Sequence, residues 1–236
     1  MTPLLKRTFV LSLMITAACH AQAPISPAQY ATMAPLDRYL ITDSKAEMAL
    51  ARSAAPPSLS RDATILILGP HGYTTAITGI NGFTCLVERA WVSPFDSHEF
   101  WNPMLRGPIC YNPAAVQTIL PYTINRTKLV LAGLTKDQMK ARILAQVAKH
   151  ELPVPAPGAM SYMMSKDGYL SDDGKNWCPH LMFSVPTAAA SFWGANLDGS
   201  PVVFNSGAID MPEGESIFMI PVSHWSDGSA APSDMM

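Results

Sequence analysis

The sequence lacks the motifs that most directly identify an activity. Its 236 residues contain no G-x-S-x-G nucleophile elbow, no H-E-x-x-H zinc motif and no phosphate-binding loop. Charged residues make up only 14% of the chain, and no cluster of lysine and arginine is present. Because phosphate contacts need clustered basic side chains, this composition argues against nucleic acid as a partner.

Long apolar runs are also missing. The longest one near the N-terminus, "TFVLSLMITAA", follows Lys6 and Arg7. It is shorter than the roughly 20 residues that a transmembrane helix needs, but it is typical of the central part of a signal peptide. We therefore expect residues 1–21 to be a signal peptide, and the mature protein to be exported, periplasmic or secreted, without a transmembrane segment. The alternative is a lipid anchor at Cys19, since "TAAC" places small residues before that cysteine.

Cysteine is scarce, with four residues in the whole chain. Cys19 would leave with the signal peptide, and Cys85, Cys110 and Cys178 would remain. In an oxidising compartment two thiols that come close form a disulfide. The spacing does not choose among the three pairings, so one disulfide and one leftover cysteine are expected.

Alternation of apolar and polar residues predicts several short strands. The stretch "ATILIL" (63–68) is apolar on both faces, as in a central strand. The stretches "YTTAIT" (73–78) and "FTCLVERAW" (83–91) flank Asn81-Gly82, a pair that favours a tight hairpin turn. Together they predict an N-terminal β-meander. Short strands separated by glycine turns return after Gly158.

Helix signals lie before and between these two groups of strands. Ser44 with Glu47, and Thr135 with Gln138, have the spacing of a capping box. Asn112-Pro113 resembles another helix start. Strands, helices and strands in this order predict an α+β fold, in which an antiparallel sheet, made of the N-terminal β-meander and the C-terminal strands, packs with two or three helices.

The domain organisation follows from the same patterns. After the signal peptide, residues 22–41 contain three prolines and little periodicity, which predicts an extended arm. Residues 42–228 are expected to form a single α+β domain, because the mature chain is long enough for one sizeable core. Residues 229–236 are a polar tail.

One candidate site is the stretch "NWCPHLMF", in which Cys178, His180 and Met182 occupy alternate positions. These side chains suit a soft metal ion. In a strand, however, the outer two lie about 13 Å apart, too far for one ion unless the chain turns sharply. The structural alternative is that Cys178 forms a disulfide, His180 makes a hydrogen bond and Met182 fills the core.

A second candidate lies near the C-terminus, in "PVSHWSDG". A histidine can act as a base near neutral pH, and a carboxylate can fix its tautomer, so His224 and Asp227 are candidate catalytic residues. The structural alternative is the end of a strand followed by a capped turn.

The segments "YLSDDGKNWCPHLMF", "FWGANLDGSPV" and "FMIPVSHWSDG" carry a resemblance to known sequences. Together they resemble a group of exported bacterial proteins that have no assigned activity. The resemblance covers about Asp43 to Gly228. It implies a single module and assigns no catalytic residue.

The leading functional hypothesis is the binding of a small molecule or a protein partner in an aromatic pocket, since pockets are mostly apolar with a few polar groups. Four tryptophans are the candidate ligand-binding residues, with His180 and His224 beside them: Trp101, Trp177, Trp193 and Trp225. One alternative is a hydrolase with His224 or His180 as general base, assisted by Asp227 or Cys178. Another is a periplasmic metal-handling protein built around His180, Cys178 and His224. The sequence identifies no cofactor.

Overall fold

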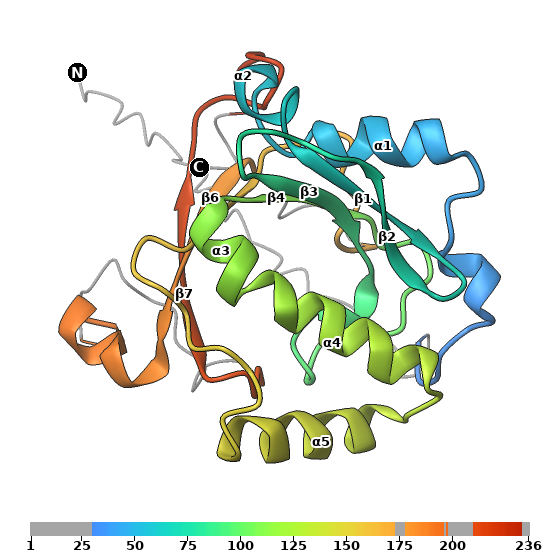
Figure 1. Ribbon diagram of the computed structural model, residues 1–236, viewed down its shortest axis with the longest axis vertical. Coiled ribbons are helices and arrows are strands. Elements are labelled where there is room, and N and C mark those ends of the chain that lie inside the picture. The colour runs from blue at the N-terminus through green and yellow to red at the C-terminus, as the bar shows by residue number, and fades with distance from the viewer. Residues whose placement is uncertain (1–29, 173–177, 196, 198–209, 233–236) are drawn as a thin grey trace, which may run out of the picture.

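A computed structural model describes residues 30–172, 178–195, 197 and 210–232 (Figure 1). The predicted signal peptide, Cys19 and Trp177 lie outside these residues. Within these residues, no helix has the length and apolar character needed to cross a membrane.

The described chain forms a seven-stranded sheet in the order β2-β1-β3-β4-β5-β6-β7. All neighbouring strands are antiparallel except β1 and β3, which run parallel. The strands are β1 (Thr64–Gly69), β2 (Gly72–Ile77), β3 (Thr84–Glu88), β4 (Gly107–Tyr111), β5 (Met160–Met163), β6 (His180–Pro186) and β7 (Glu215–Pro221). The central strands β3 and β4 are buried along their whole length.

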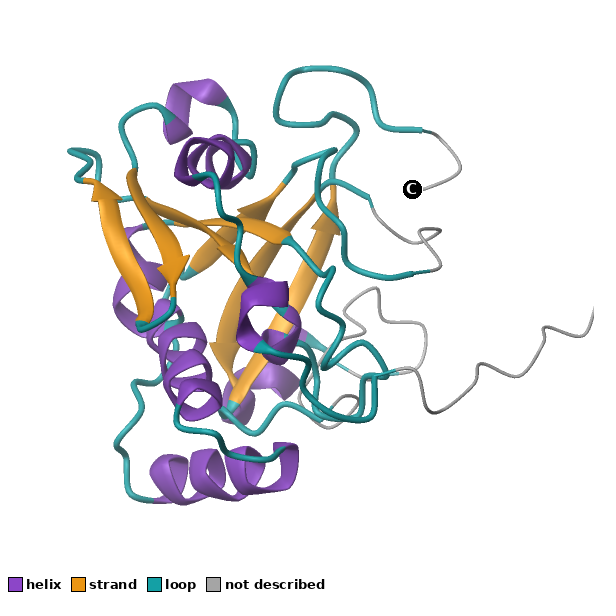
Figure 2. Ribbon diagram, turned by 90° about the vertical axis from the view of Figure 1, so that its right-hand side faces the viewer, coloured by secondary structure: helices purple, strands orange, loops and turns teal. Residues whose placement is uncertain are grey.

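Helices cover both faces of this sheet. Figure 1 shows α1 above the curved sheet and α4 below it, and Figure 2 shows helices on both sides of the strands. The α-helices are α1 (Ser44–Arg52), α2 (Pro57–Ser60), α3 (Pro113–Thr118), α4 (Leu120–Leu131) and α5 (Lys136–Ala148). Three short 3-10 helices are η1 (Leu36–Tyr39), η2 (Ala90–Val92) and η3 (Thr187–Trp193). The α+β prediction is confirmed, with α1, α4 and α5 as the three long helices.

The hairpin predicted at Asn81-Gly82 is wrong. The tight hairpin instead joins β1 to β2, where Gly69 pairs with Gly72. The chain then crosses the start of β1, and β3 pairs with the other side of β1. A Cβ at Gly79 would lie 2.3 Å from the backbone of Ala63, so this close crossing requires glycine. Asn81 stabilises this crossing, because its side-chain amide donates a hydrogen bond to the Leu59 carbonyl at 2.8 Å.

The predicted helix starts are confirmed in two cases and corrected in one. Thr135 and Gln138 form the capping box that begins α5, and the Asn112 side chain accepts a hydrogen bond from the amide of Ala115 at the start of α3. At α1 the N-cap is Asp43 instead of Ser44. Glu47 does not cap the helix, because its side chain is buried in an ion pair with Arg89.

Successive residues of each strand point to opposite faces of the sheet, and this alternation separates two cores. Cys85 and Val87 of β3 pack with the alanines of α1, while Leu86 packs with β4, α3 and α4 on the other face. Glu88, two residues after Leu86, therefore also faces α4. This face contains the candidate site.

Both ends of the described chain pack against the body. Tyr39, in the predicted arm, is fully buried and its hydroxyl donates to the carbonyl of Trp101 at 2.8 Å. Ala231, in the predicted tail, is buried and its amide donates to the Ser223 carbonyl at 2.9 Å. The domain boundaries at residues 41 and 228 remain predictions.

Candidate functional site

A cavity of about 210 Å³ lies between the α4-facing side of the sheet, helix α4 and residues 92–94 at the end of η2. We call it the inner cavity. Half of its lining is apolar: Val92, Pro94, Leu105, Ile109, Ile119, Met163, Leu170, Met182, Met211, Ile217 and Met219. Gly107 and ten polar residues complete it: Glu88, Ser93, Tyr111, Tyr122, Thr123, Arg126, Ser161, Ser184, Glu213 and Glu215. A concave site that combines apolar walls with polar groups is the usual character of a small-molecule site.

Strand register sets one wall of the inner cavity. Ser161 of β5 pairs with Met182 of β6, which pairs with Met219 of β7. Ser184 pairs with Ile217 one step along the same face. Since these five residues alternate with outward-facing neighbours, three antiparallel strands present a continuous wall of methionine, isoleucine and serine to the cavity.

Arg126 of α4 and Glu213 form an almost completely buried ion pair beside the cavity. The guanidinium donates two hydrogen bonds to the carboxylate, from Nε at 2.5 Å and from Nη2 at 2.8 Å. Its Nη1 donates to the carbonyls of Trp91 and Ser93. A buried pair of this kind is stable only when its remaining hydrogen-bonding groups are satisfied. Arg126 is therefore occupied by the protein itself.

Glu88 and two hydroxyl groups form a second polar cluster. Tyr111 Oη and Thr123 Oγ1 each donate to Glu88 Oε1 at 2.6 Å. Burial raises the pKa of Glu88, against the lowering effect of these two hydrogen bonds and of the charge on Arg126. Burial also holds the pKa of Tyr111 well above its ordinary value, so this phenol stays protonated and can donate.

Glu215 is the third buried acid, and its surroundings differ from those of Glu88 and Glu213. Its side chain is buried, and its Oε2 atom has no hydrogen-bond partner among the described residues. Burial first, and then the neighbouring charge of Glu213, raise the pKa of Glu215 to about 8, while a hydrogen bond from Ser184 opposes this rise. A buried polar oxygen without a partner is costly and rare in folded proteins.

The predicted site residue His180 begins β6 on the same face as Met182 but does not line the inner cavity. Its side chain is buried, and Nδ1 donates to the carbonyl of Cys178 at 2.8 Å. Burial lowers its pKa, against the raising effect of that hydrogen bond. His180 pairs with Pro221 of β7, so its strand lies beside the one that leads to His224.

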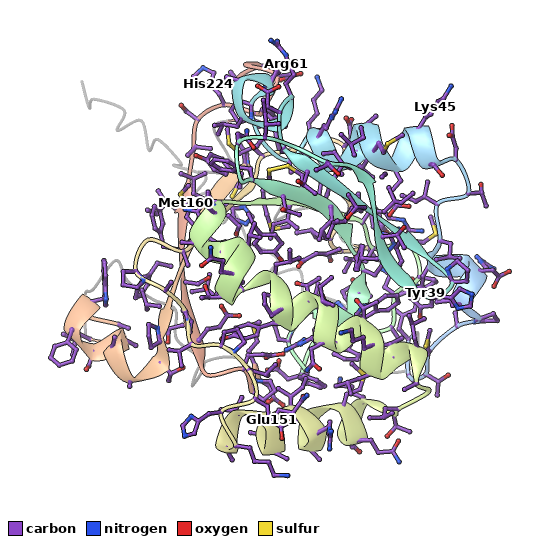
Figure 3. All side chains as sticks on the ribbon, in the orientation of Figure 1. Tyr39, Lys45, Arg61, Glu151, Met160 and His224 are labelled. Atoms are coloured by element: carbon purple, nitrogen blue, oxygen red, sulfur yellow. A yellow bond between two sulfur atoms is a disulfide. The ribbon has the colours of Figure 1, made fainter. Side chains whose placement is uncertain are left out.

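The predicted pair His224 and Asp227 lies on the surface. Figure 3 shows His224 at the same end of the molecule as Arg61, opposite the end where Glu151 lies. His224 Nδ1 shares a hydrogen bond with the Ser223 hydroxyl at 2.8 Å. Asp227 accepts from Lys166 at 2.5 Å and from Ser229, and these contacts lower its pKa. The carboxylate is thus held by groups other than the histidine.

Of the four tryptophans predicted to bind a ligand, the three that the structure describes lie in separate surroundings. Trp101 is buried in the core and packs edge-on against Phe100, with ring centroids 4.7 Å apart. Trp193 of η3 is 57% exposed and lies against Phe218, on the side of β7 that faces away from the inner cavity. Trp225 belongs to the turn after β7, where its amide donates to the Ser229 carbonyl at 2.8 Å.

The cysteines adopt one of the three predicted pairings. Cys85 of β3 and Cys110 of β4 face each other in register and form a disulfide, and both are fully buried. Cys178 is free and partly buried, so the structural alternative in which it forms a disulfide is wrong. Within the described ranges, no group of three or more histidine, cysteine and acidic side chains is placed to hold a metal ion.

Sequence patterns did not single out the acids of the inner cavity. Glu213 and Glu215 flank Gly214, which reads as a turn signal, and Glu88 follows four buried residues in β3. The one signal in the sequence was the charge of Glu88 at the end of a buried strand, because a buried charge is uncommon. Their convergence depends on segments more than 100 residues apart, which no local pattern reveals.

Comparison of the chain with protein-family models, with curated protein sequences and with solved structures found no match. The functional inference therefore depends on the geometry of the inner cavity.

Proposed function

We propose that this protein is exported and that it binds a small, mostly apolar molecule in the inner cavity. The observation that carries the proposal is a cavity of about 210 Å³ that combines an apolar wall with buried polar groups.

The volume limits the size of this ligand. Benzene, with six carbon atoms, occupies an engineered apolar cavity of about 150 Å³. In the same proportion, the inner cavity suits a molecule of about eight non-hydrogen atoms. The buried disulfide between Cys85 and Cys110 supports export, because such bonds persist mainly in oxidising compartments.

Binding can be tested with 1-heptanol as the probe, observed through the methyl signals of isotopically labelled methionine. We expect saturable shifts at Met163 and Met182, which line the cavity. We expect none at Met139, which is fully buried in a further hydrophobic cluster that contains Trp91 and is not among the lining residues. A shift at Met163 and Met182 without one at Met139 would distinguish binding in the cavity from a general effect of the alcohol on the solvent.

A matched pair of serine variants locates the site. Ser161→Leu inserts a larger side chain into the cavity wall, and we expect it to weaken heptanol binding by about tenfold or more. Ser58→Leu makes the same change on the exposed surface of α2 and leaves binding unaltered. Shifts that do not saturate, or binding that survives in a folded Ser161→Leu protein, would contradict the proposal.

A further inference from the structure

The inner cavity contains an excess of acidic groups. Three carboxyl groups line it, those of Glu88, Glu213 and Glu215, whereas Arg126 is the one basic side chain among the described lining residues. Both carboxylate oxygens of Glu213 accept from Arg126, and the other donors of that guanidinium are directed at backbone carbonyls. The described lining residues therefore offer no unoccupied cation to an anionic ligand, although an apolar pocket with an arginine would at first suggest a fatty acid.

The three acids differ in what they can still bind. Glu213 is neutralised by Arg126, and Glu88 Oε1 already accepts from Tyr111 and Thr123. Glu215 is 4% exposed and lines the cavity, and its Oε2 lacks a partner. A ligand that donates a hydrogen bond, and above all one that carries a positive charge, would satisfy this oxygen and remove the cost of burying it.

We infer that the ligand of the inner cavity is a small alkyl or aryl amine, whose protonated nitrogen pairs with the Glu215 carboxylate while its apolar body lies against Met182 and Ile217. This inference rests on the proposed function and specifies its ligand class. Ser184 belongs to the same arrangement, because it lines the cavity and lies opposite Ile217 in the sheet.

Charge coupling gives the pairing a pH dependence. The titratable groups that act on Glu215 come from several elements: Glu213 before β7, Glu88 of β3, Tyr111 of β4, and Tyr122 and Arg126 of α4. Without a ligand, burial and Glu213 favour the protonated acid. An ammonium group favours the carboxylate, so binding below about pH 8 displaces the Glu215 proton to solvent and weakens as the pH falls.

The test compares three probes with the same number of non-hydrogen atoms: heptylamine, 1-heptanol and hexanoate. At about pH 8 we expect the amine to bind at least about tenfold more tightly than the alcohol, since hydrogen bonds to charged groups contribute roughly 1.5–3 kcal/mol. Hexanoate is expected to bind more weakly than the alcohol. Calorimetry in two buffers of different ionisation enthalpy measures the proton release on amine binding.

Glu215→Gln is the diagnostic variant, and Glu151→Gln, at an exposed position, is its control. We expect Glu215→Gln to reduce amine affinity to the level of the alcohol, and Glu151→Gln to keep the full advantage of the amine. If heptanol binds but the amine has no advantage, or if the advantage persists in Glu215→Gln, the inference fails while the proposed function stands. If none of the three probes binds, both fail.

Discussion

The two faces of the sheet are packed in different ways. On the α1 face, small side chains allow the helix to approach the strands closely, and the contacting residues are almost completely buried: Ala51, Ala54, Ala55, Ala63, Cys85 and Cys110. On the α4 face, methionines, tyrosines and charged groups surround a cavity of about 210 Å³. Small residues pack closely on the α1 face, whereas long side chains around α4 line the inner cavity.

Two buried glutamates show the same contrast. Glu47 of α1 accepts from Arg89 at 2.8 Å and from the amide of Leu68 at 3.1 Å, and no buried polar atom of this pair lacks a partner. Glu215 has an oxygen without one. The first acid is part of the scaffold, and the second is available to a ligand. Satisfaction of hydrogen bonds, more than burial or charge, distinguishes the two roles.

The largest expected effect comes from breaking the scaffold pair. Glu47→Ala leaves the fully buried Arg89 without its counter-ion, and we expect the free energy of unfolding to fall by about 3–5 kcal/mol. Glu151→Ala, at an exposed position, is the control and should change it by less than about 0.5 kcal/mol. Urea denaturation measures both. Equal stability of the two variants would show that the α1 face does not depend on this pair.

Glu215→Gln is expected to change the pH dependence of stability. Because the pKa of Glu215 is raised to about 8, the folded protein binds this proton more tightly than the unfolded chain does. The stability from this group is complete below the ordinary carboxyl pKa and is lost as the pH rises toward about 8. The neutral amide removes this loss, so the variant should be more stable than the parent by up to about 4 kcal/mol at about pH 9.

Denaturation curves at about pH 5 and about pH 9 test the direction of this pH dependence. The free energies of unfolding of the parent and the variant should differ least at about pH 5. Glu88, whose pKa is also raised by burial, is present in both proteins and does not contribute to the difference. A parent protein that gains stability relative to the variant as the pH rises would show that the fold lowers the pKa of Glu215 and stabilises its carboxylate.

A smaller effect is expected from the disulfide on the α1 face. Replacing Cys85 and Cys110 together with alanine removes a cross-link between residues 25 apart in sequence, which should cost roughly 3 kcal/mol. Cys178→Ala is the matched control and should change stability little, since that thiol is free and only partly buried. A double variant as stable as this control would indicate that packing alone holds the α1 face.

Local patterns predicted the elements of this fold better than their arrangement. Asn112-Pro113 and the Thr135 capping box begin helices because capping involves residues next to each other in the chain. The Asn81-Gly82 hairpin failed because a turn-forming pair does not determine which strand its neighbour will join. Here the crossing at Gly79 and the pairing of β3 with β1 decided the topology, and both depend on contacts between distant segments.

The candidate site was less predictable, for the same physical reason. Histidine and tryptophan stand out in a sequence, but His180 bonds to its own loop and Trp101 fills the core. Met182 was interpreted as core filler or a soft-metal ligand, and it lines the inner cavity. The pKa of Glu215 is set by burial and by the charges of Glu213 and Arg126, and only the folded chain brings these groups together.

The methionines of the inner cavity have a consequence for selectivity. Met163, Met182, Met211 and Met219 contribute unbranched, polarisable thioether chains to its lining. Such chains change rotamer at little cost and adapt to differently shaped neighbours. A wall of this kind can accommodate a series of homologous guests that vary by a methylene or a branch, which is how adaptable surfaces achieve broad recognition. Discrimination among ligands would then come from Glu215, whereas the methionine side chains would accept ligands of different shape.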